Sequence, residues 1–533
     1  MHSLGRSSAL IGAGTLVSRI TGLVRNFVLA AAIGVTHSTA ADAFGIANQF
    51  PNTLFTLISS GLLAGIIVPQ IVSAMRTHSD GGSAFVSKLL TLGTVVLAAV
   101  TGVAMIAAPL LVSIYGGGLT PHGQALALAL AYWCLPQLFF YGLHALVGEA
   151  LNARRVFGPF AWSPIVNNIV SIIGFGAFIW LFGLQSDAAV WTPQMISLMG
   201  ATATFGVVLQ AVVLLFFWRR AGLHVRPDFH WRGIGLRHIA RLAGWTFLMV
   251  VVSQIAGAVQ ANLVSSASGD AAANASLQYA WLVFMLPFSV VVLSIGTPYY
   301  TRLSEHVAEG RTDAATGDLA ALTRTVGVFM VGILAAMGAA ILPLMRVFTR
   351  DVEGAVALSW VLAAYLVALL PLSFQFGIQR TFYALRDTRT PFLYTLVQAV
   401  LVIASAIVAS LTLPLEQLAF GIALGQSIAN IVQFALAIVL LRRKIGPLGL
   451  GGAARSVLRF IVAAIPAGLL GWGLFELVGG VDGWMLADRL LGLLGAGLIG
   501  LATLVAYVVF LALLRAPELK IAVDAVRRFL PGR

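Results

Sequence analysis

Long apolar stretches separated by short polar breaks recur along this whole chain. Of its 533 residues, 59% are hydrophobic and only 10% are charged, whereas soluble domains carry about 25% charged residues. A helix needs about 20 mostly apolar residues to cross the hydrocarbon core of a bilayer. The sequence therefore predicts an all-α polytopic membrane protein with fourteen spans, at 9–33, 40–75, 84–115, 121–152, 159–184, 194–222, 237–264, 272–303, 320–348, 353–385, 391–414, 416–441, 452–478 and 488–515.

The lysines and arginines fall mostly in every second loop. The basic segments are 76–88, 154–155, 219–241, 302–324, 386–389, 442–459 and the tail from 515 onward. Only Arg346, Arg350 and Arg489 lie on the other side. Because cytoplasmic loops retain Lys and Arg, both termini are predicted to be cytoplasmic. The net charge of +13 is thus a topology signal with some attraction to anionic lipids, and nucleic acid is not an expected partner.

The span pattern repeats within the chain. A shift of 232 residues places spans 1 to 5 on spans 7 to 11, and Arg154 and Pro159 then fall on Arg386 and Pro391. The alternative is a chance match between evenly spaced spans. The repeat predicts a six-span N-lobe (1–222) and C-lobe (237–444), related by a pseudo-two-fold axis along the membrane normal, as in alternating-access transporters. Outside it lie a cytoplasmic interfacial linker (223–236), spans 13 and 14 (445–515) and an amphipathic tail (516–533).

Two arginines interrupt the first apolar stretch. Arg19 and Arg25 lie about 120° apart around a helix, with Gly22 between them. A charged side chain in the bilayer centre costs roughly 2.5–3.5 kcal/mol on insertion scales, so it persists where it faces protein, water or a ligand. The pair suits an anionic ligand inside the membrane. The alternatives are that the arginines neutralise buried acids, or that Arg25 reaches to an interface.

Few other polar residues lie within the predicted spans. Asp42 begins span 2, where it either pairs with an arginine or is an ordinary acid at a helix N-terminus. Glu149 is expected to pair with Arg154 or Arg155, and His144 to be a packing residue. The remaining candidates are a second-lobe cation and three amides that offer uncharged donors to a polar headgroup: Arg380, Asn48, Asn52 and Asn167.

Enzyme signatures are missing from the sequence. It has no HExxH motif, no Gly-Lys-Ser/Thr phosphate loop and no acid cluster for a divalent metal. Its one cysteine, Cys134, lies within a span and reads as a buried apolar residue. These features predict a transporter that is not an enzyme and carries no cofactor or metal. Without a nucleotide site, such a transporter would draw on an ion gradient or the membrane potential.

Five short motifs stand out along the chain: Ser18-Arg19-x-x-Gly22-x-x-Arg25, Ala41-Asp42-Ala43-Phe44, Phe50-Pro51-Asn52, Ile67-Val68-Pro69 and Phe382-Tyr383-Ala384-x-x-Asp387-Thr388-x-Thr390-Pro391. They resemble motifs of the MurJ/MviN lipid II flippases, which belong to the multidrug/oligosaccharidyl-lipid/polysaccharide exporter superfamily. The resemblance covers all fourteen spans, and these motifs are its most specific parts.

The resemblance implies export of an undecaprenyl-pyrophosphate-linked peptidoglycan precursor across a bacterial inner membrane. It implies cavity roles for Arg19, Arg25 and Asp42, and a groove for the lipid tail in spans 13 and 14. Lipid II and membrane lipids are the implied partners, and cell-wall synthesis proteins are candidate partners.

Some positions depart from the family pattern. Asn26 stands where relatives have an acid, and Phe55-Thr56 where many have a basic pair. Tyr279 to Leu282 lack the expected cavity arginine, and span 7 has no acid for a sodium site. Arg19 and Arg25 therefore remain the main predicted pyrophosphate ligands, with Asp42 competing for them when the site is empty. The rival functions are export of another anionic lipid-linked glycan and a non-transporting scaffold for cell-wall synthesis.

Overall fold

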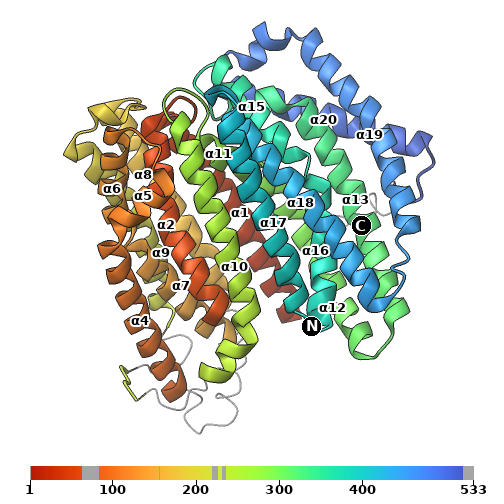
Figure 1. Cartoon of the computed structure of the whole chain (residues 1–533), viewed down its shortest axis with the longest axis horizontal. Helices are drawn as coiled ribbons and strands as arrows, with labels where there is room; N and C mark the ends of the chain where they lie inside the picture. Colours follow the sequence, from red (N-terminus) through yellow and green to blue (C-terminus); the bar gives the residue numbers. More distant parts are fainter. Residues whose placement is uncertain (1, 63–82, 155, 219–225, 231–235, 520–533) are drawn as a thin grey trace. The chain divides into compact units, whose positions relative to one another are not determined.

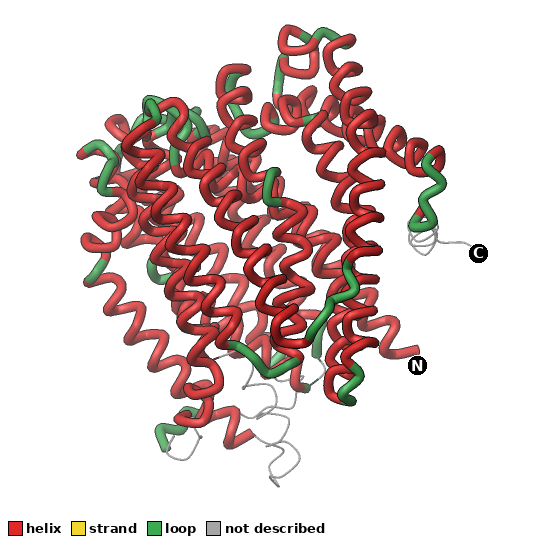
Figure 2. Tube along the Cα trace, turned by 45° about the vertical axis from the view of Figure 1, so that its right-hand side comes forward, coloured by secondary structure: helices red, strands yellow, loops and turns green. Residues whose placement is uncertain are grey.

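The computed structural model describes residues 2–62, 83–154, 156–218, 226–230 and 236–519. Every regular element in these ranges is helical (Figure 2). Thirteen of the helices are long and apolar enough to cross a membrane, which confirms a multi-pass membrane protein. The predicted count of fourteen spans is not confirmed. The second predicted span, 40–75, begins in α2 (Thr39–Leu62) and ends outside the described residues.

The chain divides into two compact units, Met1–Gly269 and Asp270–Arg533. The helices of unit 1 are α1 (His2–Ile33), α2, α4 (Ser83–Ile106), α5 (Ala108–Gly116), α6 (Pro121–Cys134), α7 (Gln137–Ala153), α8 (Gly158–Phe182), η1 (Ala188–Val190), α9 (Pro193–Phe216), α10 (Leu236–Val264) and η3 (Ser265–Ala267) (Figure 1).

Helix α10 packs with unit 1, although its span was predicted to open the second lobe. It contacts α2 and α5. Asn262 Nδ2 donates hydrogen bonds to the carbonyl oxygens of Ser113 (3.2 Å) and Ile114 (2.9 Å), and Ser265 Oγ accepts one from the Gly118 amide at 2.9 Å. These contacts hold the end of α10 against α5 and the turn that follows it. The lobe limits 1–222 and 237–444 stay a prediction.

The helices of unit 2 are α11 (Asn274–Pro287), η4 (Phe288–Val292), α12 (Leu293–Ala308), α13 (Thr312–Ala339), α14 (Ile341–Arg346), α15 (Val352–Leu366), α16 (Leu369–Ala384), α17 (Arg389–Thr412), α18 (Leu415–Ile445), α19 (Gly451–Leu477), η5 (Gly480–Asp482), η6 (Trp484–Leu486) and α20 (Arg489–Leu513).

The 232-residue repeat is visible in the breaks between helices. Shifting α6 and α7 by 232 gives 353–366 and 369–385, and α15 and α16 occupy 352–366 and 369–384. The break between α4 and α5 likewise corresponds to the one between α13 and α14. Helices α6 and α15 also begin with similar caps. Thr120 Oγ1 accepts a hydrogen bond from the Gly123 amide, and Asp351 Oδ1 accepts one from the Gly354 amide.

Close helix contact in unit 1 depends on glycine. A Cβ on Gly206 of α9 would lie 2.3 Å from Asn167 Oδ1 of α8, and one on Gly174 of α8 would lie 2.2 Å from a methyl of Thr202 of α9. Small residues at such positions let membrane helices approach each other closely. The glycine pair therefore sets the distance between α8 and α9, and with it the position of Asn167.

Spans 13 and 14, which lie outside the repeat, correspond to α19 and α20. They pack against each other and against α13. Tyr507 Oη of α20 donates a hydrogen bond to the Val328 carbonyl oxygen of α13 at 3.0 Å. Most of the predicted tail, 516–533, and of the predicted linker, 223–236, falls outside the described residues. The described end of the tail carries Glu518, whose carboxylate accepts a hydrogen bond from Ser456 Oγ of α19 at 2.6 Å.

Candidate functional site

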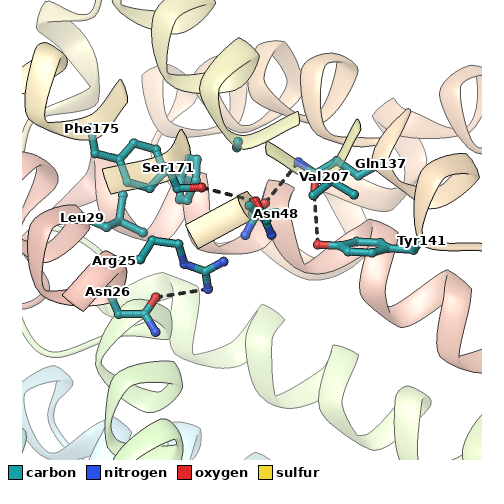
Figure 3. A pocket seen from close by; sticks show the side chains of 12 residues that line it. Arg25, Asn26, Leu29, Asn48, Gln137, Tyr141, Ser171, Phe175 and Val207 are labelled. Carbon is teal, nitrogen blue, oxygen red and sulfur yellow. Dashed lines mark hydrogen bonds between the residues drawn. The ribbon is translucent and has the colours of Figure 1, made fainter. Parts of the chain in front are cut away.

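A polar pocket lies inside unit 1 between α1, α2, α7, α8 and α9 (Figure 3). Its cavity volume is about 40 Å³, which is room for about three water molecules. No carboxylate is among the lining residues that the structure describes. The polar ones supply one guanidinium, several amides and two hydroxyls: Arg25, Asn26, Asn48, Gln137, Tyr141, Asn167 and Ser171. A cation surrounded by neutral hydrogen-bond donors is chemistry that suits an anion.

Arg25 supplies the positive charge of the pocket. It lies on α1 and is half-buried, and its Nη2 donates a long hydrogen bond to Asn26 Oδ1 at 3.5 Å. Figure 3 shows its side chain extending into the pocket from the same helix as Asn26 and Leu29. Because Asn26 is an uncharged amide, it accepts this hydrogen bond without neutralising the charge of Arg25.

Gln137, a residue that the sequence analysis missed, joins three helices at the pocket. It is 1% exposed, and its Nε2 donates to Asn48 Oδ1 of α2 (3.4 Å) and to Thr204 Oγ1 of α9 (3.2 Å). Its Oε1 accepts a hydrogen bond from Tyr141 Oη at 3.3 Å. A buried amide satisfied in this way holds its partners in fixed orientations. Its place directly after Pro136, at the break between α6 and α7, was the available signal.

The paired asparagines of α8 have separate roles. Asn167 lines the pocket, and its Oδ1 accepts a hydrogen bond from Ser171 Oγ at 3.4 Å. Asn168 Nδ2 donates to the Ser18 carbonyl oxygen and to Thr21 Oγ1 of α1, each at 3.0 Å. A Cβ on Gly22 would come within 3.5 Å of that same amide. Gly22 therefore lies at the α1–α8 contact, which positions Arg25 one turn farther along.

Asp42 lies in the first turn of α2 and is 1% exposed. Its Oδ2 accepts a hydrogen bond of 2.6 Å from Ser268 Oγ, just after η3. In this conformation Asp42 therefore ties the N-terminal end of α2 to the segment that follows α10. Its predicted exchange with Arg19 and Arg25 stays a prediction.

Besides Gly22 and Asp42, two further predicted site residues are not part of the pocket lining. Arg19 is half-buried on α1, about 9 Å along the helix axis from Arg25 at 1.5 Å per residue. Asn52 is exposed on α2, one residue after the in-helix Pro51. The structure therefore brings Arg25, Asn48 and Asn167 together, with Gly22 supporting them from behind, and leaves Arg19 and Asn52 outside.

The secondary candidates lie elsewhere. Among the described residues no ion pair joins Glu149 to Arg154. Its alternative partner, Arg155, lies outside them, so the expected pair stays a prediction. His144 Nε2 is 2.8 Å from Ser163 Oγ, and its ring stacks on Phe160, as expected of a packing histidine.

Arg380 belongs to unit 2. Its guanidinium lies over the rings of Phe376 (5.0 Å), Tyr300 (5.2 Å) and Tyr383 (5.9 Å). Cation–π contacts of this kind are worth about 0.5–2 kcal/mol each. The rings hold the charged group near the end of α16 without cancelling its charge.

Long apolar helices, a repeated pattern of helix breaks and a cationic pocket inside the membrane helices together define a polytopic membrane transporter. A family model described as lipid II flippase MurJ matches residues 29–514. The chain therefore belongs to the MurJ family, whose members are flippases rather than enzymes.

Curated relatives match over almost the whole chain. A probable lipid II flippase MurJ of Synechocystis sp. is 25% identical over 98% of this chain and 97% of its own length. The Vibrio cholerae relative of the same description is 26% identical over 97% of this chain and 98% of its own length.

Solved structures share the fold. A lipid II flippase MurJ in an inward closed conformation matches with a TM-score of 0.71 at 22% identity, covering 92% of this chain and 98% of its own. An inward-facing MATE transporter of the MOP superfamily matches with a TM-score of 0.63 at 15% identity, covering 81% and 95%. At these identities the two structures support the fold alone.

Proposed function

We propose that this chain is a lipid II flippase that moves an undecaprenyl-pyrophosphate-linked muropeptide from the inner to the outer leaflet by alternating access. The observation that carries the proposal is a guanidinium, Arg25, in an acid-free polar pocket inside a chain that matches the MurJ family over residues 29–514. The pyrophosphate is the part of this substrate that needs a cation. Its polyprenyl tail needs only lipid or an apolar groove, and spans 13 and 14 are the proposed groove.

Arg25 and Arg19 are the proposed pyrophosphate ligands. The pocket, at about 40 Å³, holds water but is too small for a muropeptide headgroup. We therefore propose that the amides of Asn48 and Asn167, inside the pocket, hold one edge of the Arg25 guanidinium. The pyrophosphate then binds its other edge. Arg19, on the same broad face of α1, supplies the second charge. Binding of the anion neutralises both cations and lowers the cost of moving the site within the membrane.

Asp42 is the proposed conformational partner of this site. Its hydrogen bond to Ser268 ties the N-terminal end of α2 to the segment after η3, and a conformational change there would free the carboxylate for other partners. A released carboxylate has a strong drive to find a cation, because an unpaired buried charge is costly. Arg19 and Arg25 are the candidates once the pyrophosphate has left, so the empty site would be neutralised by Asp42.

The membrane potential is a sufficient energy source for such a cycle. Moving one elementary charge across 100 mV is worth about 2.3 kcal/mol. The pyrophosphate would neutralise both arginines, whereas Asp42 alone would leave one positive charge in the empty site, and this difference would couple the potential to transport. Both termini are proposed to lie in the cytoplasm of the bacterial cell, as the charge of the loops predicts.

Depletion of the protein tests the substrate, because the accumulating lipid-linked precursor identifies it. We expect the undecaprenyl-pyrophosphate muropeptide to accumulate in the inner leaflet. Arg19→Ala and Arg25→Ala should insert normally and be abundant, yet fail to relieve the accumulation. The matched control is Arg443→Ala, which removes an exposed guanidinium at the end of α18. Normal flipping in both arginine variants would reject the assigned ligands.

Two other outcomes would support the rival functions. Accumulation of a different anionic glycan precursor would favour a superfamily exporter with another substrate, as the missing cavity arginine of span 8 allows. Loss of cell-wall assembly without accumulation of any precursor would favour a scaffold.

A further inference from the structure

A second cavity, in unit 2, is much larger than the arginine pocket and almost entirely apolar. It has a volume of about 710 Å³ and lies between α13, α14, α15, α16, α19 and η5. No residue of α20 lines it. It is therefore distinct from a groove formed jointly by spans 13 and 14, and its chemistry is unrelated to pyrophosphate binding.

Because the lining of the cavity offers few polar groups, a hydrocarbon chain is its suitable occupant. Its hydroxyl, on Ser359, donates to the carbonyl oxygens of Ala355 (2.6 Å) and Ile341 (3.3 Å). A group already bonded in this way offers little to a polar ligand. Water is unfavourable in a cavity without polar partners, and the long helices around this one belong to three of the candidate membrane spans. In that setting, acyl chains are the abundant apolar molecules.

The cavity has the depth of one bilayer leaflet. Along α15 it extends from Val356 to Val367, which is about 16 Å at 1.5 Å per residue. Half of the ~30 Å hydrocarbon core is about 15 Å. Val356 lies one turn inside the start of α15 at Val352. The cavity thus occupies the leaflet next to the α14–α15 turn, which the charge of the loops predicts to be the outer one.

The turn beyond the α15 end of the cavity, here called its rim, carries both signs of charge. Arg350, in the α14–α15 turn, and Glu353, in the first turn of α15, are both exposed. Glu353, Val356 and Trp360 recur at i, i+3 and i+7, so Glu353 lies on the helix face that lines the cavity. Asp351 is engaged as the N-cap of α15, so Arg350 and Glu353 are the cation and the anion left to complement a headgroup that itself carries both charges.

We infer that unit 2 binds a zwitterionic glycerophospholipid, such as phosphatidylethanolamine, with one acyl chain in this cavity. The phosphate lies at Arg350 and the ammonium at Glu353. The lipid is a resident of the outer leaflet that fills the space between α13, α15 and α19. This site is independent of the flippase proposal, since it involves neither Arg25 nor the polyprenyl substrate.

Gly338 offers a direct test of the site. It lines the cavity, and a Cβ there would meet no atom within 4 Å, so Gly338→Leu adds side-chain volume at a position that is open at its Cβ. Gly497→Leu on α20 is the matched control, because Gly497 is equally open but does not line the cavity. Trp360 and Trp472 line it and report on a bound chain.

The protein is purified in detergent and titrated with near-stoichiometric phosphatidylethanolamine that carries a brominated acyl chain. We expect quenching of tryptophan fluorescence in the wild type and in Gly497→Leu, and at least a tenfold weaker response in Gly338→Leu. Most of the quenching should disappear in a Trp360→Phe, Trp472→Phe double variant. Native mass spectrometry should find one retained phosphatidylethanolamine in the wild type and a loss of that lipid in Gly338→Leu.

Several results would overturn the inference. Equal quenching in Gly338→Leu and the wild type would mean contact with bulk lipid only. A retained polyprenyl lipid would reassign the cavity to the substrate tail. Preference for an anionic over a zwitterionic phospholipid, or affinity unchanged by Arg350→Gln and Glu353→Gln, would contradict the headgroup assignment. The two rim variants change exposed residues, so they remain informative if Gly338→Leu fails to fold.

Discussion

At the scale of single residues, the site depends on a glutamine that carries no charge. Gln137 is bonded to Asn48, Thr204 and Tyr141, on three different helices of unit 1. Bulk water is not available within the membrane to replace these partners. Loss of the amide would leave the half-buried side chains of Tyr141 and Asn48 without this hydrogen-bond partner, in the same pocket as Arg25.

Replacement of Gln137 by leucine should therefore destabilise the protein. Leucine is similar in size but cannot bond to the neighbouring groups, and one buried polar group left unsatisfied costs about 1–3 kcal/mol. We expect a lower midpoint of thermal unfolding in detergent for Gln137→Leu, and weaker flipping than a stability change alone explains. Gln194→Leu, at the exposed start of α9, is the control. Equal midpoints for the two variants would contradict a structural role for Gln137.

The sequence predicts some of these residues better than others. Arg19 and Arg25 stand out because a guanidinium in an apolar stretch is costly and so must have a purpose. Gln137 does not stand out, because an uncharged amide costs less to bury than a guanidinium and so does not by itself indicate a functional site. The partner of Asp42 could not be predicted either, since Ser268 is 226 residues away and only the packing of α10 brings the two together.

At the scale of elements, the glycines between α8 and α9 determine how closely the two helices approach. Gly206→Ala would bring a methyl within 2.3 Å of Asn167 Oδ1, so the asparagine or the helix must move. Overpacking of this kind costs about 1–3 kcal/mol. We expect a lower thermal midpoint and reduced flipping, because Asn167 lines the arginine pocket. Gly176→Ala, on α8 with no atom within 4 Å of the new methyl, should behave as wild type; a matching loss there would refute the steric explanation.

The turn between α16 and α17 provides a pH-dependent contact. Burial raises the pKa of the Asp387 carboxyl, but hydrogen bonds from Lys444 and Thr390 outweigh this effect and hold the pKa below its usual value. A carboxyl with a lowered pKa in the folded state stabilises the fold above the ordinary pKa of about 3.9. That stabilisation is lost as the pH falls through the folded-state value.

Wild type should therefore be more stable than Asp387→Asn near neutral pH, and this difference should be smaller in acid. We expect the variant to be less stable by about 1 kcal/mol or less between pH 5 and 7, since Lys444 is partly exposed. The difference should shrink below about pH 4. Circular dichroism melts of both proteins at pH 3 to 7 measure it, and a difference that grows on acidification would contradict the assigned charge state.

Element boundaries were largely predictable because apolar length and proline position fix them locally. The break before α7 coincides with Pro136, and the 232-residue offset places the corresponding break before α16. The packing of α10 was not predictable from the repeat, because which neighbour a span contacts depends on distant residues such as Ser113 and Gly118.

At the scale of the whole molecule, the distribution of cations along the chain predicts its orientation in the membrane. Labelling with a membrane-impermeant thiol reagent in intact cells tests it. The one cysteine, Cys134, is buried and can be replaced by serine first. His122→Cys, in the exposed first turn of α6, should then react from outside. Arg443→Cys should react only after the cells are opened. The reverse pattern would invert the proposed direction of transport.

The central claim is that a guanidinium inside unit 1 binds the pyrophosphate of the transported lipid. The most direct measurement is transbilayer movement of fluorescent lipid II in proteoliposomes that contain equal amounts of wild type, Arg25→Ala or Arg443→Ala. The account predicts movement with wild type and Arg443→Ala, and at least a tenfold slower rate with Arg25→Ala. Undiminished movement with Arg25→Ala, in protein shown to be folded, would contradict it.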